Sequence, residues 1–169
     1  ESAEALDQAI RTAQGVGAHL VMGCDPDADR LGVAVLHQGQ WRTLNGHDIA
    51  ALVTQAALNQ HSHPEPLVLK TDVTTQLVTR IAESHGAEIV DDLLVGFKHI
   101  GDALFMLERK GRFQDVDGDV ERFAAGVEES HGVLITAAVR DKDAAGGALL
   151  LAAMASTAAA QGRTLVDEL

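Results

Sequence analysis

The chain has 169 residues, of which 46% are hydrophobic, so it can bury a core and is neither a disordered nor a fibrous protein. Its 13 Lys and Arg against 25 Asp and Glu give a net charge of −12, which disfavours nucleic acid and anionic membrane partners. The single Cys24 excludes an internal disulfide and fits a reducing, cytoplasmic location, and no apolar run has transmembrane length. Because the sequence begins with Glu1 rather than Met, we expect a piece of a longer protein.

The first 45 residues predict one helix and three strands. Apolar residues at helical spacing predict a helix over residues 2–12, which Gly15 and Gly17 end. Turns are predicted at residues 38–40 and at Asn45-Gly46. The predicted strands cover residues 19–23, 31–36 and 41–44.

After residue 45 the pattern changes to alternating strands and helices, which is typical of an α/β layer structure with a mixed, largely parallel sheet. We expect a domain boundary near Asn45-Gly46, which leaves an α/β domain over residues 46–169 and an N-terminal remnant over residues 1–45 that is too short to fold with its own core. An acidic connection is expected over residues 112–122. The predicted helices cover residues 47–59, 75–85, 100–110 and 141–160, and the predicted strands cover residues 66–70, 87–90, 123–127 and 133–137.

The segment CDPDADR lies on the loop between the first two predicted strands. Alternate side chains of an extended segment point the same way, so Asp25, Asp27 and Asp29 converge if the loop curves. A hard cation is the simplest way to neutralise three such carboxylates, and Mg²⁺ leaves a coordination position for a phosphate oxygen. The guanidinium of Arg30 matches the same phosphate.

Two other interpretations of this segment stand beside the metal site. A solvated acidic loop without metal is the ordinary meaning of a short charge run. An EF-hand fails, because its sixth position is Arg30 rather than Gly and its twelfth is Leu36 rather than Glu. A second acidic segment, residues 115–119, alternates carboxylates in the same way but has no Arg after it, and we expect a solvated loop there.

Three further loops carry candidate ligand-binding residues. The segment VGFKHIG opens a helix, where Lys98 and backbone N–H groups could hold an anion, although an incidental surface Lys is the simpler interpretation. The segment GVEESHG places Glu128 and Ser130 in a loop whose donors and acceptors suit sugar hydroxyls, or form only a polar hairpin. In RDKD, Arg140 and Lys142 could hold a phosphate, or Asp141 or Asp143 could cap the last helix.

Together, CDPDADR, VGFKHIG, GVEESHG and RDKD resemble, in order and spacing, the loops of the α-D-phosphohexomutase superfamily, the phosphoglucomutases and phosphomannomutases. The resemblance extends through nearly the whole chain and covers the end of the family's second domain and all of its third. It implies a three-layer α/β/α domain with a mixed, largely parallel sheet over residues 46–169, preceded by the C-terminal part of a second α/β domain over residues 1–45. It implies an isomerase that moves a phosphoryl group between positions 1 and 6 of a hexose through a phosphoserine and a bisphosphorylated sugar. The serine-bearing first domain and the phosphate-binding fourth domain lie outside the resemblance, so we expect this chain alone to be inactive.

The resemblance also assigns roles to residues. It implies Mg²⁺ ligation by Asp25, Asp27 and Asp29, and assistance at the phosphoserine by Arg30. It implies contacts to sugar hydroxyls by Glu128 and Ser130, and substrate binding by Lys98 and Lys142. The partners implied are a hexose phosphate, a hexose bisphosphate and the remaining domains of the parent enzyme.

The departures from the family pattern concern the sugar. Val127 stands where many phosphoglucomutases have Gly, and Phe97-Lys98 differs from the His-containing phosphomannomutase form. A phosphopentomutase, an amino-sugar mutase and a sugar-phosphate binding module without chemistry are therefore kept as alternatives.

Overall fold

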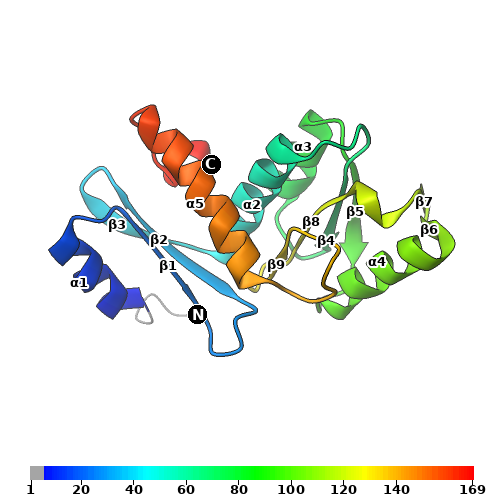
Figure 1. Ribbon diagram of the computed structural model, residues 1–169, viewed down its shortest axis with the longest axis horizontal. Helices are drawn as coiled ribbons and strands as arrows, with labels where there is room; N and C mark the ends of the chain where they lie inside the picture. Colours follow the sequence, from blue (N-terminus) through cyan, green and yellow to red (C-terminus); the bar gives the residue numbers. More distant parts are fainter. Residues whose placement is uncertain (1–5) are drawn as a thin grey trace.

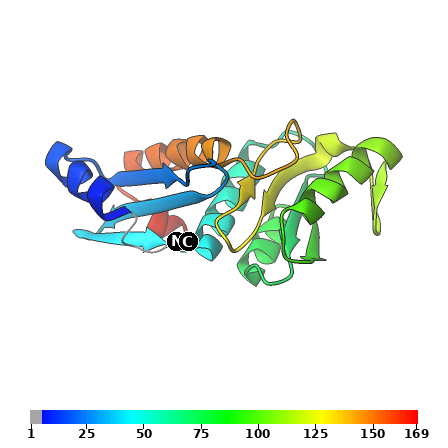
Figure 2. The same ribbon diagram turned by 90° about the horizontal axis from the view of Figure 1, so that it is seen from below.

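The computed structural model describes residues 6–169, which form two sheets lying side by side with the long helix α5 between them (Figure 1). Seen from below, the molecule is elongated, with the first sheet at one end and a small hairpin at the other (Figure 2). The helices are α1 (Asp7–Val16), α2 (Gly46–Gln60), α3 (Gln76–Ser84), α4 (Lys98–Lys110) and α5 (Ala144–Ala160), with short 3₁₀ turns at η2 (Val120–Arg122) and η3 (Leu165–Glu168). The strands are β1 (Leu20–Cys24), β2 (Leu31–His37), β3 (Gln40–Leu44), β4 (Leu67–Thr71), β5 (Glu88–Leu93), β6 (Arg112–Phe113), β7 (Val116–Asp117), β8 (Phe123–Val127) and β9 (Val133–Leu134).

The first sheet is antiparallel with the order β1-β2-β3. Alternation along β2 sends Val33 and Val35 into the main core and Ala34 to the opposite face, where it packs near Ala13 of α1. The main core also contains Leu151 of α5, so one face of this sheet is buried against the second half of the chain. The acidic loop between β1 and β2 is held at the boundary between the two sheets.

The second sheet has the order β5-β4-β8-β9, in which β4 pairs in parallel with β5 and β8, and β8 pairs antiparallel with β9. Val68 of β4 packs with α2 and α3, whereas its neighbours Leu67 and Leu69 pack with α4. Helices therefore cover both faces, which confirms the predicted three-layer α/β/α class with a mixed, largely parallel sheet. The short loops after β4 and β8 meet at one edge, where sheets of this kind place ligands.

Several predicted boundaries were wrong, each for a local reason. The connection over residues 112–122 contains the hairpin β6-β7, whose two-residue strands are too short to show a periodic pattern. Asn45 is not in a turn but is the N-cap of α2, and forms a capping box with Asp48. The strand β9 ends at Leu134 instead of residue 137. The helix predicted from residue 141 begins at Ala144, because Asp143 caps it by accepting from the backbone N–H groups of Ala145 and Gly146.

The helix predicted over residues 2–12 is described from residue 7 onward, and the part over residues 1–5 lies outside the described residues. Over residues 6–169, every helix is too short or too polar to cross a membrane.

Candidate metal and phosphate site

The loop after β1 folds back on itself and brings three carboxylates together. Pro26 occupies the second position of a turn in which the Ala28 N–H donates to the Asp25 carbonyl (3.0 Å). Ala28 has a left-handed backbone, with φ of 59°, which turns the chain toward β2. Each carboxylate of Asp25, Asp27 and Asp29 offers one oxygen, and these oxygens lie within 4.8 Å of one another.

The donor set fits a hard divalent cation. Of the residues 6–169, these three form the one group of three or more His, Cys, Asp and Glu side chains that converges in this way. All donors are carboxylate oxygens, which Mg²⁺ prefers. The Asp29 Oδ1 atom is buried and makes no hydrogen bond, and the Nε atom of Arg30 lies 3.5 Å from it. Burying a carboxylate oxygen without a hydrogen-bond donor is unfavourable, and coordination of a cation would compensate for this cost.

Asp25 anchors the loop from within. Its Oδ1 accepts from the backbone N–H groups of Asp29 and Arg30, both at 3.1 Å, and its Oδ2 lies 3.1 Å from Arg30 Nε. Burial alone would raise the pKa of Asp25, but these backbone hydrogen bonds and the guanidinium hold the pKa below its ordinary 3.8. The carboxylate is therefore kept ionised and in place for a cation.

The loop between β8 and β9 brings the candidate sugar contacts to the same edge. Glu128 is buried, and its Oε1 accepts from Ser130 Oγ at 2.6 Å. The neighbouring Glu129 turns the other way and accepts from the hydroxyl groups of Thr71 (3.0 Å) and Thr74 (3.4 Å). Glu129 thus fastens this loop to the carboxyl end of β4, and Glu128 and Ser130 are left paired with each other.

The acidic loop and the Glu128–Gly132 loop are joined directly. Arg30 and Gly132 form an antiparallel bridge, and the Leu31 N–H donates to the His131 carbonyl at 3.1 Å. The His131 Nδ1 atom lies 3.1 Å from the Leu31 carbonyl and is the donor, because a carbonyl oxygen only accepts. His131 adopts a left-handed backbone with φ of 71°, which allows both contacts. The metal-ligand candidates and the sugar-contact candidates therefore form one continuous site.

Lys142 reaches this site from the start of α5. Its Nζ lies 2.9 Å from Asp29 Oδ2, 3.4 Å from Asp141 Oδ1 and 5.6 Å from the centre of the Phe97 ring. Burial alone would lower the pKa of Lys142, but the carboxylates of Asp29 and Asp141 outweigh it and raise the pKa above its ordinary value. The ammonium is therefore a permanent positive charge next to a candidate metal ligand.

Lys98 stands apart from the other predicted residues. It is the first residue of α4 and is exposed, and its side chain forms no hydrogen bond or ion pair within residues 6–169. Its neighbour Phe97 is buried and carries the ring that faces Lys142. The structure thus brings together seven of the eight predicted residues. The eighth, Lys98, lies outside this group and is connected to it only through its chain neighbour Phe97, whose ring faces Lys142.

Sequence reasoning missed Lys70, which is fully buried at the end of β4. Its Nζ donates to the backbone carbonyls of Thr71, Thr74 and Asp91 at 3.0 to 3.4 Å and so joins the ends of β4 and β5. Burial lowers the pKa of this ammonium. The signal was available, because a Lys closing the apolar strand LVLKT is expected to have internal partners.

The second acidic segment has a different structure. It begins in the turn of the β6-β7 hairpin, includes strand β7 and ends at the cap of η2, and its three Asp residues are exposed. Asp119 caps η2 by accepting from the Glu121 N–H at 2.8 Å, and Asp117 lies 3.6 Å from Arg112. The expected exposure of these carboxylates to solvent is confirmed, but Val116 and Asp117 form a short strand rather than a loop.

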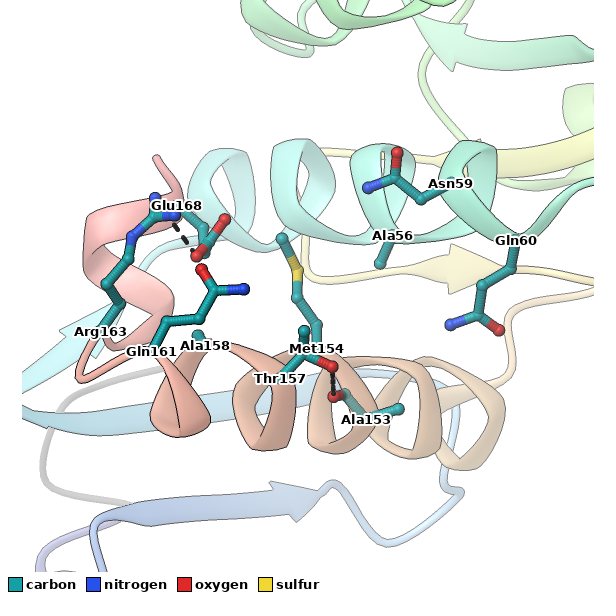
Figure 3. Close-up of a pocket in the computed structure, with 10 residues that line it drawn as sticks. All are labelled: Ala56, Asn59, Gln60, Ala153, Met154, Thr157, Ala158, Gln161, Arg163 and Glu168. Carbon is teal, nitrogen blue, oxygen red and sulfur yellow. Dashed lines mark hydrogen bonds and ion pairs between the residues drawn. The ribbon is translucent and has the colours of Figure 1, made fainter.

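A pocket of about 350 Å³ lies elsewhere, between α2 and α5 (Figure 3). Amide side chains of Asn59, Gln60 and Gln161 line it, and the pair Arg163 and Glu168 closes one end. None of the eight predicted site residues lines this pocket. This pocket is therefore separate from the candidate site.

Comparison with known proteins defines the class to which this fold and site belong. Residues 45–169 match the family described as phosphoglucomutase/phosphomannomutase, alpha/beta/alpha domain III, and the chain belongs to this family. A solved structure from Thermus thermophilus covers 97% of this chain and 32% of that chain, with a TM-score of 0.68 at 24% identity. A phosphoglucomutase/phosphomannomutase family protein from Burkholderia thailandensis covers 87% of this chain and 28% of that chain, with a TM-score of 0.62 at 19% identity.

Curated relatives give the more particular similarity. A phosphoglucomutase of Staphylococcus haemolyticus is 34% identical over the whole chain, and a phosphoribomutase of Saccharomyces cerevisiae is 33% identical over 85% of it. The chain spans 29% of the first of these relatives and 23% of the second. It thus matches less than a third of each enzyme.

Proposed function

We propose that this chain supplies the metal-binding and sugar-binding loops of a Mg²⁺-dependent phosphohexomutase that interconverts hexose 1-phosphate and hexose 6-phosphate. Residues 1–45 contribute the end of one domain with the metal loop, and residues 46–169 form the next domain with the sugar loop. The phosphorylated serine and a further phosphate-binding loop come from parts of the enzyme outside these 169 residues, and the enzyme works in the cytoplasm. The observation that carries the proposal is the direct joining of the acidic loop to the Glu128–Gly132 loop through Arg30 and Gly132.

In this proposal Asp25, Asp27 and Asp29 hold Mg²⁺, whose positive charge stabilises the transferring phosphoryl group. Arg30 lies 3.1 Å from Asp25 and neutralises the phosphoryl oxygens from the protein side. Phosphoryl transfer requires little chemistry from the protein beyond such positioning and neutralisation. The four side chains therefore account for the charged half of the site.

The remaining residues of the site bind the sugar phosphate. Glu128 accepts and Ser130 both donates and accepts, so exchanging their mutual 2.6 Å hydrogen bond for bonds to a diol leaves each group satisfied. Lys98, which follows Phe97 in the chain, and Lys142, whose Nζ lies 5.6 Å from the centre of the Phe97 ring, hold the phosphate of the substrate. Between the two transfer steps, the bisphosphorylated hexose reverses its orientation within the site.

A coupled mutase assay tests the proposal. The full-length parent enzyme is expected to convert glucose 1-phosphate to glucose 6-phosphate with Mg²⁺, and the 169-residue chain is expected to give no turnover. A parent without mutase activity on any hexose 1-phosphate would contradict the proposed activity. Turnover by the chain alone would contradict the assignment of the serine to another part of the enzyme.

A second candidate activity is the isomerisation of a pentose phosphate. It is favoured by the 33% identity to the phosphoribomutase of S. cerevisiae. Comparison of kcat/KM for glucose, mannose, glucosamine and ribose 1-phosphates separates the two. A preference for ribose 1-phosphate would replace the hexose assignment and would leave the metal and phosphate roles unchanged.

A further inference from the structure

Lys142 contacts parts of all the candidate loops. Its ammonium pairs with Asp29 of the acidic loop and lies over Phe97 of the segment that opens α4. Its stem crosses Gly132, where an added Cβ would collide with the Lys142 Cδ and with Glu128. Because Gly132 has no side chain, it leaves the space that the Lys142 side chain occupies on its way to Asp29.

The charges of this cluster are already nearly balanced without a metal. Three carboxylates face two cations, because Arg30 lies 3.1 Å from Asp25 and Lys142 lies 2.9 Å from Asp29. The Lys142 side chain is only 16% exposed, so water screens its charge weakly. A divalent cation that binds the carboxylates is repelled by this ammonium, which lies 2.9 Å from Asp29, one of the candidate ligands of the cation.

The same position is favourable for an anion. Once a divalent cation occupies the three carboxylates, the cation, Arg30 and Lys142 together outweigh their negative charge, so the cluster attracts a phosphate. A Lys ammonium has three donors and rotates on a flexible stem, so it can leave Asp29 for a phosphate oxygen without movement of the backbone.

We propose that Lys142 is an internal counter-ion of the Asp25–Asp29 cluster, which competes with the divalent cation for Asp29 and turns to the substrate phosphate when the cation binds. This inference rests on the proposed function for the identity of the metal and phosphate ligands. It goes beyond that function, because it makes metal affinity depend on a residue outside the acidic loop and couples metal binding to phosphate binding.

Replacing Lys142 is expected to raise the affinity for the metal and to lower the affinity for phosphate. In the 169-residue chain, Lys142→Met removes the competing charge, so Mn²⁺ is expected to bind about three- to tenfold more tightly in calorimetry, the range for loss of a partly buried charge pair. Inorganic phosphate added to the Mn²⁺-loaded chain is expected to bind several-fold more weakly. Lys110→Met makes the same change of charge at the far end of α4 and is expected to alter neither affinity.

A purely structural role would weaken both affinities together. A lower Mn²⁺ affinity in Lys142→Met would mean that Lys142 orients Asp29 for the metal, and unchanged affinities would mean that it is a bystander; either result overturns the counter-ion proposal. Unchanged phosphate binding would overturn the transfer to phosphate. Failure of both the wild type and the variant to bind millimolar Mn²⁺ would contradict the metal site of the proposed function itself.

The wild-type chain provides a test that needs no substitution. In a titration with Mg²⁺ followed by carbon-detected NMR, the Cε signal of Lys142 is expected to move as Asp29 is taken up by the cation, whereas that of Lys110 stays fixed. A Lys142 signal that does not move while the amide signals of residues 25–30 shift would show that Lys142 keeps Asp29 in the metal-bound state, and would overturn the proposal.

Discussion

Two segments of the chain, residues 25–29 and residues 115–119, alternate carboxylates in the same way and have different structures. The Asp25 side chain is 5% exposed and is anchored by backbone N–H groups, whereas the Asp117 side chain is 74% exposed at the end of strand β7, where it pairs with Arg112. The first segment has Arg30 and Lys142 at its carboxylates, and the second has Arg112 at 3.6 Å. Alternation alone therefore does not bring carboxylates together; in the first segment a turn converges the oxygens, and resident cations offset their repulsion.

The largest expected difference between the segments is in activity. In the full-length parent, Asp27→Ala removes a ligand of the cation and is expected to lower kcat by roughly a hundredfold or more. Asp117→Ala removes an exposed carboxylate from the hairpin and is expected to change kcat less than about twofold. The coupled assay measures both, and equal effects of the two substitutions would remove the distinction.

The next effect concerns the close packing behind the first segment. Gly132→Ala places a methyl group against Lys142 and Glu128 and is expected to lower the free energy of unfolding by about 1–3 kcal/mol, the range for overpacking. Gly15→Ala in α1 meets no atom within 4 Å and is expected to leave stability unchanged or to raise it slightly. Urea denaturation of the two variants measures the difference, and a neutral Gly132→Ala would show that the loops are loosely packed.

A smaller effect on stability distinguishes two capping residues: Asp143, which caps α5 beside the first segment, and Asp119, which ends the second segment and caps η2. Asp143→Ala removes an acceptor for two N–H groups at the start of the 17-residue α5 and is expected to cost about 1 kcal/mol. Asp119→Ala removes the cap of the three-residue η2 and is expected to cost less. Thermal melts compare the two, and a larger loss for Asp119→Ala would mean that the hairpin is more important to stability than its exposure indicates.

The smallest expected effect is on pH dependence. Because the folded-state pKa of Asp25 lies below its ordinary 3.8, its ionised form contributes stability that is present above that value and is lost as pH falls through the folded-state pKa. The stability advantage of the wild type over Asp25→Asn is therefore expected to shrink as urea titrations move from pH 6 toward pH 3. An advantage that grows toward pH 3 would contradict the direction of the shift.

The sequence predicted the architecture well where patterns were long. The apolar runs of β2, β4 and β8 predicted strands within one residue of the observed ones, and the order of elements predicted the α/β class. The hairpin β6-β7 was missed because two residues cannot show a period. The early end of β9 follows from the start of α5, where the Asp143 N–H donates to the Val133 carbonyl, a contact between segments.

The candidate site was predictable in its residue types but not in its connections. Charge alternation and Arg30 indicated a cation beside a phosphate, and Glu128 with Ser130 indicated a polyol. The bridge from Arg30 to Gly132, the left-handed backbones of Ala28 and His131, and the reach of Lys142 to Asp29 depend on how distant loops pack. Local sequence patterns contain no record of such contacts.

The central claim is that residues 25–29 bind a divalent cation and residues 115–119 do not. Titration of the 169-residue chain with Mn²⁺, followed by paramagnetic broadening of its amide signals, tests it most directly. We predict that the signals of residues 25–30 broaden first, together with those of Gly132 and Lys142, while the signals of residues 115–119 stay sharp. Broadening that begins at residues 115–119, or that affects both segments equally, would contradict the claim.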